Sequence, residues 1–90
     1  MEALYFDKTY STKVLDVTLI EPRLKHSTIF GLYEDLNERE SLVIKNDHDP
    51  RPLHYQFLAE KGEKAFSWEY IENGPETWIV RITKKRREKK

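Results

Sequence analysis

The stretch S-L-V-I-K-N-D-H-D-P, residues 41–50, predicts a β-strand that leads directly into a helix. Its first six residues place Leu42 and Ile44 on one face and polar or smaller side chains on the other, in the period-two pattern of a strand. Asp49 and Pro50 form a helix-start signal, in which the aspartate is the expected N-cap and the proline is the first helical residue. A strand followed by a helix is therefore the central unit of the fold.

The same periodicities continue on both sides of this stretch and give the order βαβαββ. The predicted elements are a strand from Lys13 to just before Pro22, a helix at His26–Leu36, a strand at residues 41–46, a helix at residues 50–60, and strands at residues 66–71 and 78–83. Gly62 is expected to end the second helix. The pair Asn73-Gly74 predicts a turn that returns the last strand antiparallel to the third.

The predicted strands have one apolar face and one mixed face. The apolar face collects Leu15, Val17, Leu19, Leu42, Ile44, Phe66, Trp68, Tyr70, Trp78, Val80 and Ile82. The other face is mostly polar and charged. A sheet of this kind is covered by helices on one side only, and right-handed crossovers make its first three strands parallel. We expect an α+β fold, a two-layer sandwich with a mixed four-stranded sheet and both helices on one face.

The composition limits the classes of function. The chain has 90 residues, of which 38% are hydrophobic, and its 16 basic and 16 acidic side chains cancel. It has no cysteine, which excludes disulfides, thiolate zinc sites and cysteine nucleophiles. No apolar run is long enough to span a membrane, and the N-terminus carries no secretion signal. We expect a single cytoplasmic domain without membrane contact.

The charges are distributed unevenly along the chain. Residues 84–90 hold six basic side chains and one acidic one, so the remaining body is acidic. The predicted organisation is a lead-in at residues 1–12, a folded domain at residues 13–83 and a basic disordered tail at residues 84–90. Nucleic acid is an unlikely partner, because no aromatic side chain interleaves the tail and the body would repel phosphate.

The carboxyl ends of the three parallel strands are expected to meet at one edge, called the rim here. Ligands of open α/β sheets favour this edge, where helix N-termini point their N–H groups. The predicted rim residues are Glu21, Arg23, His26, Asp47, His48, Asp49 and Arg51. We expect them to bind a protein partner or a small ligand.

Other interpretations of the rim stay open. Imidazole and carboxylate side chains suit zinc or iron, with His26, His48 and His54 as candidate ligands. A histidine beside a carboxylate also suits acid–base chemistry. A purely structural interpretation has Asp49 capping the helix, Asp47 bonding a turn amide and His48 in solvent. No catalytic residue and no resident cofactor are predicted.

The string N-D-H-D-P-R-P-L-H-Y-Q-F, residues 46–57, resembles domain-of-unknown-function family 2249. The likeness continues through L-D-V at residues 15–17, F-S-W-E-Y at 66–70 and G-P-E-T-W-I-V-R-I at 74–82. The resemblance implies a fold similar to that of the TusA/SirA sulfur carriers. This fold agrees with the two-layer sandwich expected from the one apolar face of the predicted strands. The resemblance also implies that domains of this kind occur beside hemerythrin-like and other iron or redox modules.

The chain departs from those carriers at the residue that matters most for their chemistry. Where their C-P-x-P motif presents a cysteine, this chain has Glu21, followed by Pro22, Arg23 and Leu24. A carboxylate cannot form a persulfide, so sulfur transfer by this route is excluded. We therefore expect a non-catalytic binding or accessory module on a carrier-like scaffold, with a metal-binding or acid–base rim as the alternative.

Overall fold

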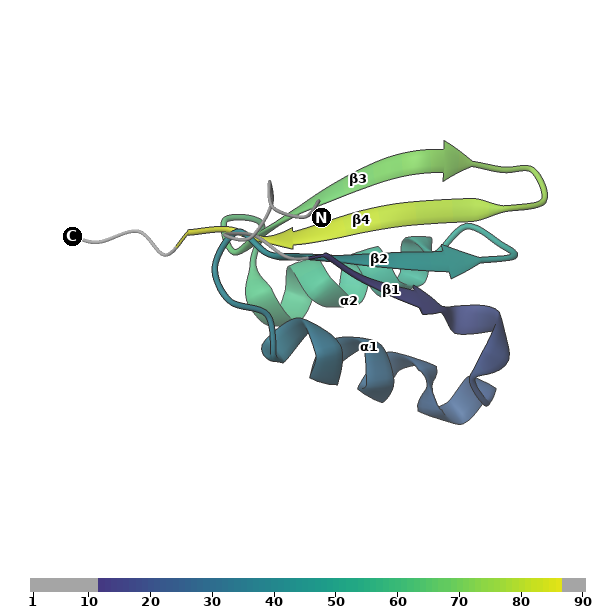
Figure 1. The fold of residues 1–90 in the computed structure, drawn as a ribbon, viewed down its shortest axis with the longest axis horizontal. Coiled ribbons are helices and arrows are strands. Elements are labelled where there is room, and N and C mark those ends of the chain that lie inside the picture. Colours follow the sequence, from purple (N-terminus) through teal and green to yellow (C-terminus); the bar gives the residue numbers. More distant parts are fainter. Residues whose placement is uncertain (1–11, 87–90) are drawn as a thin grey trace, which may run out of the picture.

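The computed structural model describes residues 12–86 and contains the predicted four strands and two α-helices (Figure 1). The strands are β1 (Thr12–Asp16), β2 (Ser41–Asn46), β3 (Phe66–Asn73) and β4 (Trp78–Lys84). The helices are α1 (Lys25–Glu34) and α2 (Arg51–Lys61), and two short 3-10 turns, η2 (Val17–Leu19) and η3 (Pro22–Leu24), precede α1. None of the helices described between residues 12 and 86 is long and apolar enough to cross a membrane.

The four strands form one mixed sheet in the order β1-β2-β4-β3. β1 pairs parallel with β2, whereas β4 lies between β2 and β3 and is antiparallel to both. The first three strands therefore run in the same direction, and their carboxyl ends lie at one end of the molecule (Figure 1). The mixed sheet expected from the sequence is confirmed.

Both helices pack on the apolar face of this sheet, which confirms the two-layer arrangement. Leu42 and Ile44 of β2 are completely buried, as are Val80 and Ile82 of β4. Phe57 of α2 is completely buried against them, in a single cluster that includes residues of α1. The core thus lies between the central strands and the two helices, and no helix of residues 12–86 covers the other face of the sheet.

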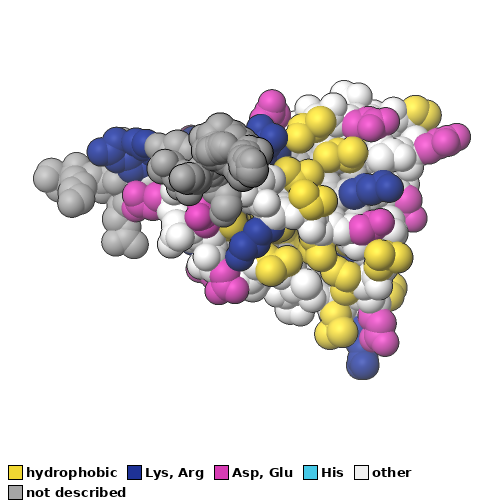
Figure 2. Space-filling view, in the orientation of Figure 1, with side chains coloured by type: hydrophobic (Ala, Val, Ile, Leu, Met, Phe, Trp, Pro, Cys, Tyr) yellow, Lys and Arg dark blue, Asp and Glu magenta, His cyan; other side chains and the backbone are white. Residues whose placement is uncertain are grey.

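The open face mixes apolar and charged side chains (Figure 2). Val14 is 75% exposed and Ile71 is 50% exposed. A register shift between Tyr70 and Glu72 places Ile71 at an irregularity of β3. Charges of opposite sign are paired in register nearby, as with Glu69 and Arg81.

The first strand is shorter than the sequence pattern predicts. It ends at Asp16, whose side chain accepts a hydrogen bond from the backbone N–H of Thr18 and so caps the turn η2. The prediction that Leu19 belongs to the apolar face is wrong, because the turn leaves it 82% exposed, whereas Val17 is buried. A short polar side chain that bonds to its own backbone competes with the strand ladder at this point.

The strands include a residue on each side of the predicted 13–83 domain. Thr12 is part of β1, and β4 continues through Lys84. Lys84 N–H donates to Glu40 O, and Lys85 N–H donates to Ala65 O. The lead-in at residues 1–11 and the tail at residues 87–90 lie outside the described residues.

Candidate functional site

The rim is built by the segments that follow β1 and β2. In both cases a short connection leads from the end of the strand to the N-terminus of a helix, so the starts of α1 and α2 meet at the same end of the sheet (Figure 1). The β3–β4 turn lies at this end as well. There Gly74, at φ 87°, donates its N–H to Thr77 O, and the positive φ suits glycine.

A small cavity of about 70 Å³ lies between the starts of the two helices. Three elements and their connections line it. The lining residues are Val17, Lys25, His26, Ile29, Asn46, His48, Pro50, Pro52 and Leu53. Two of the predicted rim residues, His26 and His48, therefore face one cavity.

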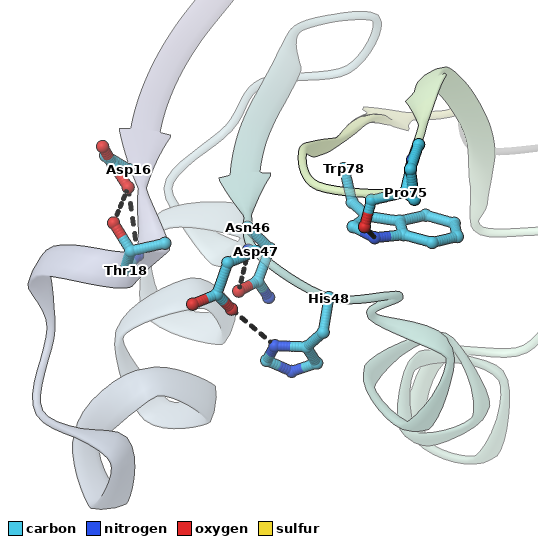
Figure 3. Close-up of polar contacts among 7 residues, drawn as sticks. All are labelled: Asp16, Thr18, Asn46, Asp47, His48, Pro75 and Trp78. Carbon is cyan, nitrogen blue, oxygen red and sulfur yellow. Dashed lines mark hydrogen bonds and ion pairs between the residues drawn. The ribbon is translucent and has the colours of Figure 1, made fainter.

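Asn46 is the buried polar group of this cavity. It is the last residue of β2 and is only 6% exposed. Its side-chain oxygen accepts the N–H of Asp47 at 2.9 Å, which fixes the orientation of the amide (Figure 3). Among residues 12–86 the one buried side-chain polar atom without a hydrogen-bond partner is Trp68 Nε1 on β3, so the Asn46 amide is not left unsatisfied in the core.

Asp47 and His48 form a hydrogen-bonded pair at the mouth of the cavity. The distance from His48 Nδ1 to Asp47 Oδ1 is 2.7 Å, and both side chains are more than half exposed. This bond from the imidazole is the main reason why the pKa of Asp47 lies below its ordinary value. Since an ionised carboxylate only accepts, Nδ1 is the protonated nitrogen, and Nε2 is turned away from Asp47 (Figure 3).

Glu21 and Arg23 lie near the rim but not in the cavity. Their side chains pair with each other at 3.2 Å, and both are well exposed. Glu21 precedes η3 and makes no side-chain cap there. An ion pair exposed to this degree contributes little to stability.

The prediction that Asp49 caps the second helix is wrong. The helix starts one residue later, with Pro50 in the N-cap position and Pro52 in the first turn, and no side chain caps it. Asp49 instead accepts the hydroxyl hydrogen of Tyr70 at 2.8 Å and pairs with Arg51 at 3.1 Å. Tyr70 lies on β3, so a tertiary contact replaces the local cap.

His54 is separated from the other two histidines. Its ring stacks on Trp68 at 4.3 Å between centroids, nearly parallel, whereas His26 and His48 line the cavity. Burial lowers the pKa of His54, and the nearby charge of Asp49 opposes this effect. Within residues 12–86 no group of three His, Asp or Glu side chains is placed to hold a metal ion.

A larger open groove of about 560 Å³ lies at the opposite end of the molecule. Two of its lysines, Lys61 and Lys84, contact the C-terminal end of α1. Lys84 Nζ donates to Glu34 O and Leu36 O, and Lys61 pairs with the Glu34 side chain. Lys84 thus satisfies one carbonyl at the end of α1 and one just after it, as expected for a cation at a helix C-terminus.

Sequence reasoning missed Lys25 and Asn46 as site residues. The only local signal for Asn46 is a polar residue at an inward-facing position of an otherwise apolar strand. Lys25 carries no local signal, because a lysine in a first helical turn is usually a solvated side chain. The proximity of both residues to His48 depends on how the two helices pack.

A comparison with known proteins identifies the family. The family model of the uncharacterized conserved protein DUF2249 matches residues 14–84, which is nearly all of the described chain. No curated protein and no solved structure matches. The match includes the residue 46–57 string and the strands that form the core. The chain belongs to the DUF2249 family of uncharacterized conserved proteins.

Proposed function

We propose that this DUF2249 domain is a non-catalytic binding module whose site is the cavity between the starts of α1 and α2. The observation that carries this proposal is the set of polar groups around the cavity. His26, His48 and Lys25 come from two different segments, and the side chain of Asn46, a buried residue, lies in the same lining. A pocket lined by apolar walls and a few convergent polar groups is the usual form of a ligand site.

The geometry favours binding over the alternatives for the rim. The three candidate metal ligands are divided between the cavity and the Trp68 stack, so they do not converge on one ion. The Asp47–His48 pair has the right distance for acid–base work, but both side chains are open to solvent. A general base needs a substrate held beside it, and of this pair only His48 belongs to the lining of the cavity.

Screening by NMR tests the proposal. A set of small anionic, neutral and cationic compounds is added to isotope-labelled protein, and the ring signals of the three histidines and the Asn46 side-chain amide are followed. We expect binders to shift His26, His48 and Asn46 together and to leave His54 unchanged. His48→Ala should weaken these binders, whereas the matched variant His54→Phe should not.

The proposal would be wrong if the compounds that bind shift signals elsewhere, such as those of the lysine-lined groove. It would also fail if no compound of any charge moves the cavity signals. Folding of each variant is checked by its amide spectrum before the titration.

A further inference from the structure

The open groove of about 560 Å³ is lined mainly by basic side chains. They come from the end of α2, the α2–β3 connection and the end of β4, which lie at one end of the molecule (Figure 1). The basic residues of the lining are Lys61, Lys64, Lys84, Lys85 and Arg86. Within residues 12–86 the acidic residues of the lining are Glu34 and Glu38. The groove therefore carries an excess of positive charge, although the basic and acidic side chains of the whole chain cancel.

Two of these cations belong to the fold itself. Lys84 Nζ donates to carbonyls at the end of α1, and Lys61 pairs with the Glu34 side chain. Both ammonium groups also lie over the Tyr33 ring, at 4.9 Å for Lys84 and 5.8 Å for Lys61. Tyr33 is only 2% exposed, so the floor of the groove offers little apolar surface. A partner would therefore be held by the remaining charges.

The other three cations of the lining, Lys64, Lys85 and Arg86, are exposed. Lys64 and Arg86 form no ion pair with any residue between 12 and 86. Lys85 Nζ donates to the backbone carbonyl of Glu63 at 3.3 Å, which leaves its charge without a counter-ion. Since Glu34 pairs with Lys61, Glu38 is the acidic side chain of the lining that remains to oppose these three.

The sequence that follows the groove adds charge of the same sign. Beyond Arg86 the chain continues with R-E-K-K, residues 87–90, which hold three basic side chains and one acidic one. Clustered charges of one sign attract an oppositely charged partner over roughly a Debye length, about 8–10 Å near physiological salt. The groove and the residues attached to it therefore favour an acidic partner.

The kinds of side chain in the groove favour carboxylates over a nucleic acid. Phosphate groups are recognised best by the two-pronged guanidinium of arginine, and Arg86 is the only arginine of the lining within the described residues. Single strands of nucleic acid need exposed aromatic rings for stacking, whereas Tyr33 is buried. Glu38 also interrupts the positive surface that a continuous phosphate backbone would follow.

We propose that the groove and the basic residues after it form a docking surface for an acidic peptide segment of a partner protein. Carboxylates of the segment would pair with Lys64, Lys85 and Arg86. Each exposed pair is weak, so several carboxylates of one segment must bind together, and a single small anion binds poorly. This surface is separate from the cavity, so the proposal stands or falls independently of the function proposed above.

Titration of the isotope-labelled full chain with a blocked hexaglutamate peptide, followed by NMR, tests the proposal. We expect saturable shifts of the backbone amides of Lys64, Lys85 and Arg86, and no saturation with free glutamate. Added salt should weaken the binding, because the contacts are exposed charge pairs.

The double variant Lys64→Gln, Lys85→Gln should weaken peptide binding about tenfold, since two charge contacts are lost. Glutamine keeps a donor for the Glu63 carbonyl. The matched control is Arg23→Gln, Lys45→Gln, which removes the same charge from two exposed residues outside the lining. Binding to the control should change less than about twofold, because distant exposed charges are screened. The amide spectrum of each variant checks its folding.

Four results would overturn the proposal. The first is equal loss of binding in both double variants, which would show general charge attraction. The second is a set of shifts confined to residues 87–90, which would leave the groove without a role. The third is tighter binding of a thymidine oligonucleotide of equal charge, which would change the class of partner. The fourth is absence of saturable binding of hexaglutamate at low salt.

Discussion

Tyr70 fixes the position of Asp49 and so changes how the second helix begins. Its hydroxyl donates to the Asp49 carboxylate at 2.8 Å, and Arg51 pairs with the other oxygen at 3.1 Å. Burial and this hydrogen bond both raise the pKa of Tyr70 above its ordinary value. The carboxylate is therefore held toward the sheet, and the start of α2 stays without a side-chain cap.

Tyr70→Phe removes this hydroxyl and should destabilise the domain by about 1 kcal/mol. The carboxylate loses its donor from β3, while its exposed pair with Arg51 compensates only in part. The midpoint of urea unfolding measures the change. Tyr55→Phe is the matched control on α2, because Tyr55 is 61% exposed and its change should stay within about 0.5 kcal/mol. Equal midpoints for the two variants would show that the Asp49 contact is not stabilising.

At the scale of elements, the end of β4 stabilises the end of α1. Lys84 Nζ donates to Leu36 O at 2.8 Å and to Glu34 O at 3.2 Å, and it lies 4.9 Å from the centre of the Tyr33 ring. A cation at a helix C-terminus satisfies free carbonyls and complements the helix dipole. Lys84 is thus a structural residue and not the start of a solvated tail.

Lys84→Met should lower the free energy of unfolding by about 1 kcal/mol, because the last carbonyls of α1 lose their donor. Methionine keeps most of the aliphatic length of the side chain, so the effect is confined to the ammonium group. Urea unfolding at low and high salt measures it. Lys64→Met, at an exposed position of the same groove, should change little. A Lys84 variant as stable as the Lys64 variant would contradict the capping role.

At the scale of the whole molecule, His54 links the helix layer to the sheet layer and makes stability depend on pH. Burial against the Trp68 ring lowers the pKa of His54 below its ordinary value of 6.5, and Asp49 offsets part of this. The unfolded chain therefore binds a proton at a higher pH than the folded chain does. The contribution is fully present above the unfolded pKa of about 6.5 and is lost as the pH falls toward the folded pKa.

Stability should accordingly fall as the pH is lowered from about 7 through the lowered pKa of His54. The measurement is urea unfolding across this range, together with NMR titration of the His54 ring. His54→Phe keeps an aromatic ring on Trp68 but cannot titrate, so its stability should vary less with pH. The lowered pKa values of Asp16 and Asp47 act below this range, since their ordinary value is 3.8. A His54 ring that titrates at or above 6.5 would contradict the prediction.

Much of the fold follows from local patterns in the sequence. Alternation at residues 41–46 and 78–82 reflects strands with one buried face, and helical spacing at Ile29 and Tyr33 reflects a helix with one buried side. Gly62, at φ 85°, ends α2 as predicted, because glycine adopts this conformation without strain. These features can be predicted from the sequence because each depends on residues that are close together in the chain.

The candidate site was predictable only in part. The position of the rim and the inclusion of His26 and His48 follow from the topology, since parallel strands end at the same edge. The sequence by itself thus determined the order of elements, the direction of the strands and the edge of the sheet at which His26 and His48 lie. Each of these is set by periodicity and by short connections.

Only the tertiary structure decided the strand order, the separation of His54 from the cavity and the partners of Asp49 and Lys84. Tyr70 is 21 residues from Asp49, and Lys84 is 50 residues from Glu34. A local cap at Asp49 and a solvated tail at Lys84 are each reasonable from neighbouring residues alone. Neither forms, because the packing of the two layers brings other partners to these groups. A partly buried carboxylate or helix end is satisfied by whichever donor the fold places beside it.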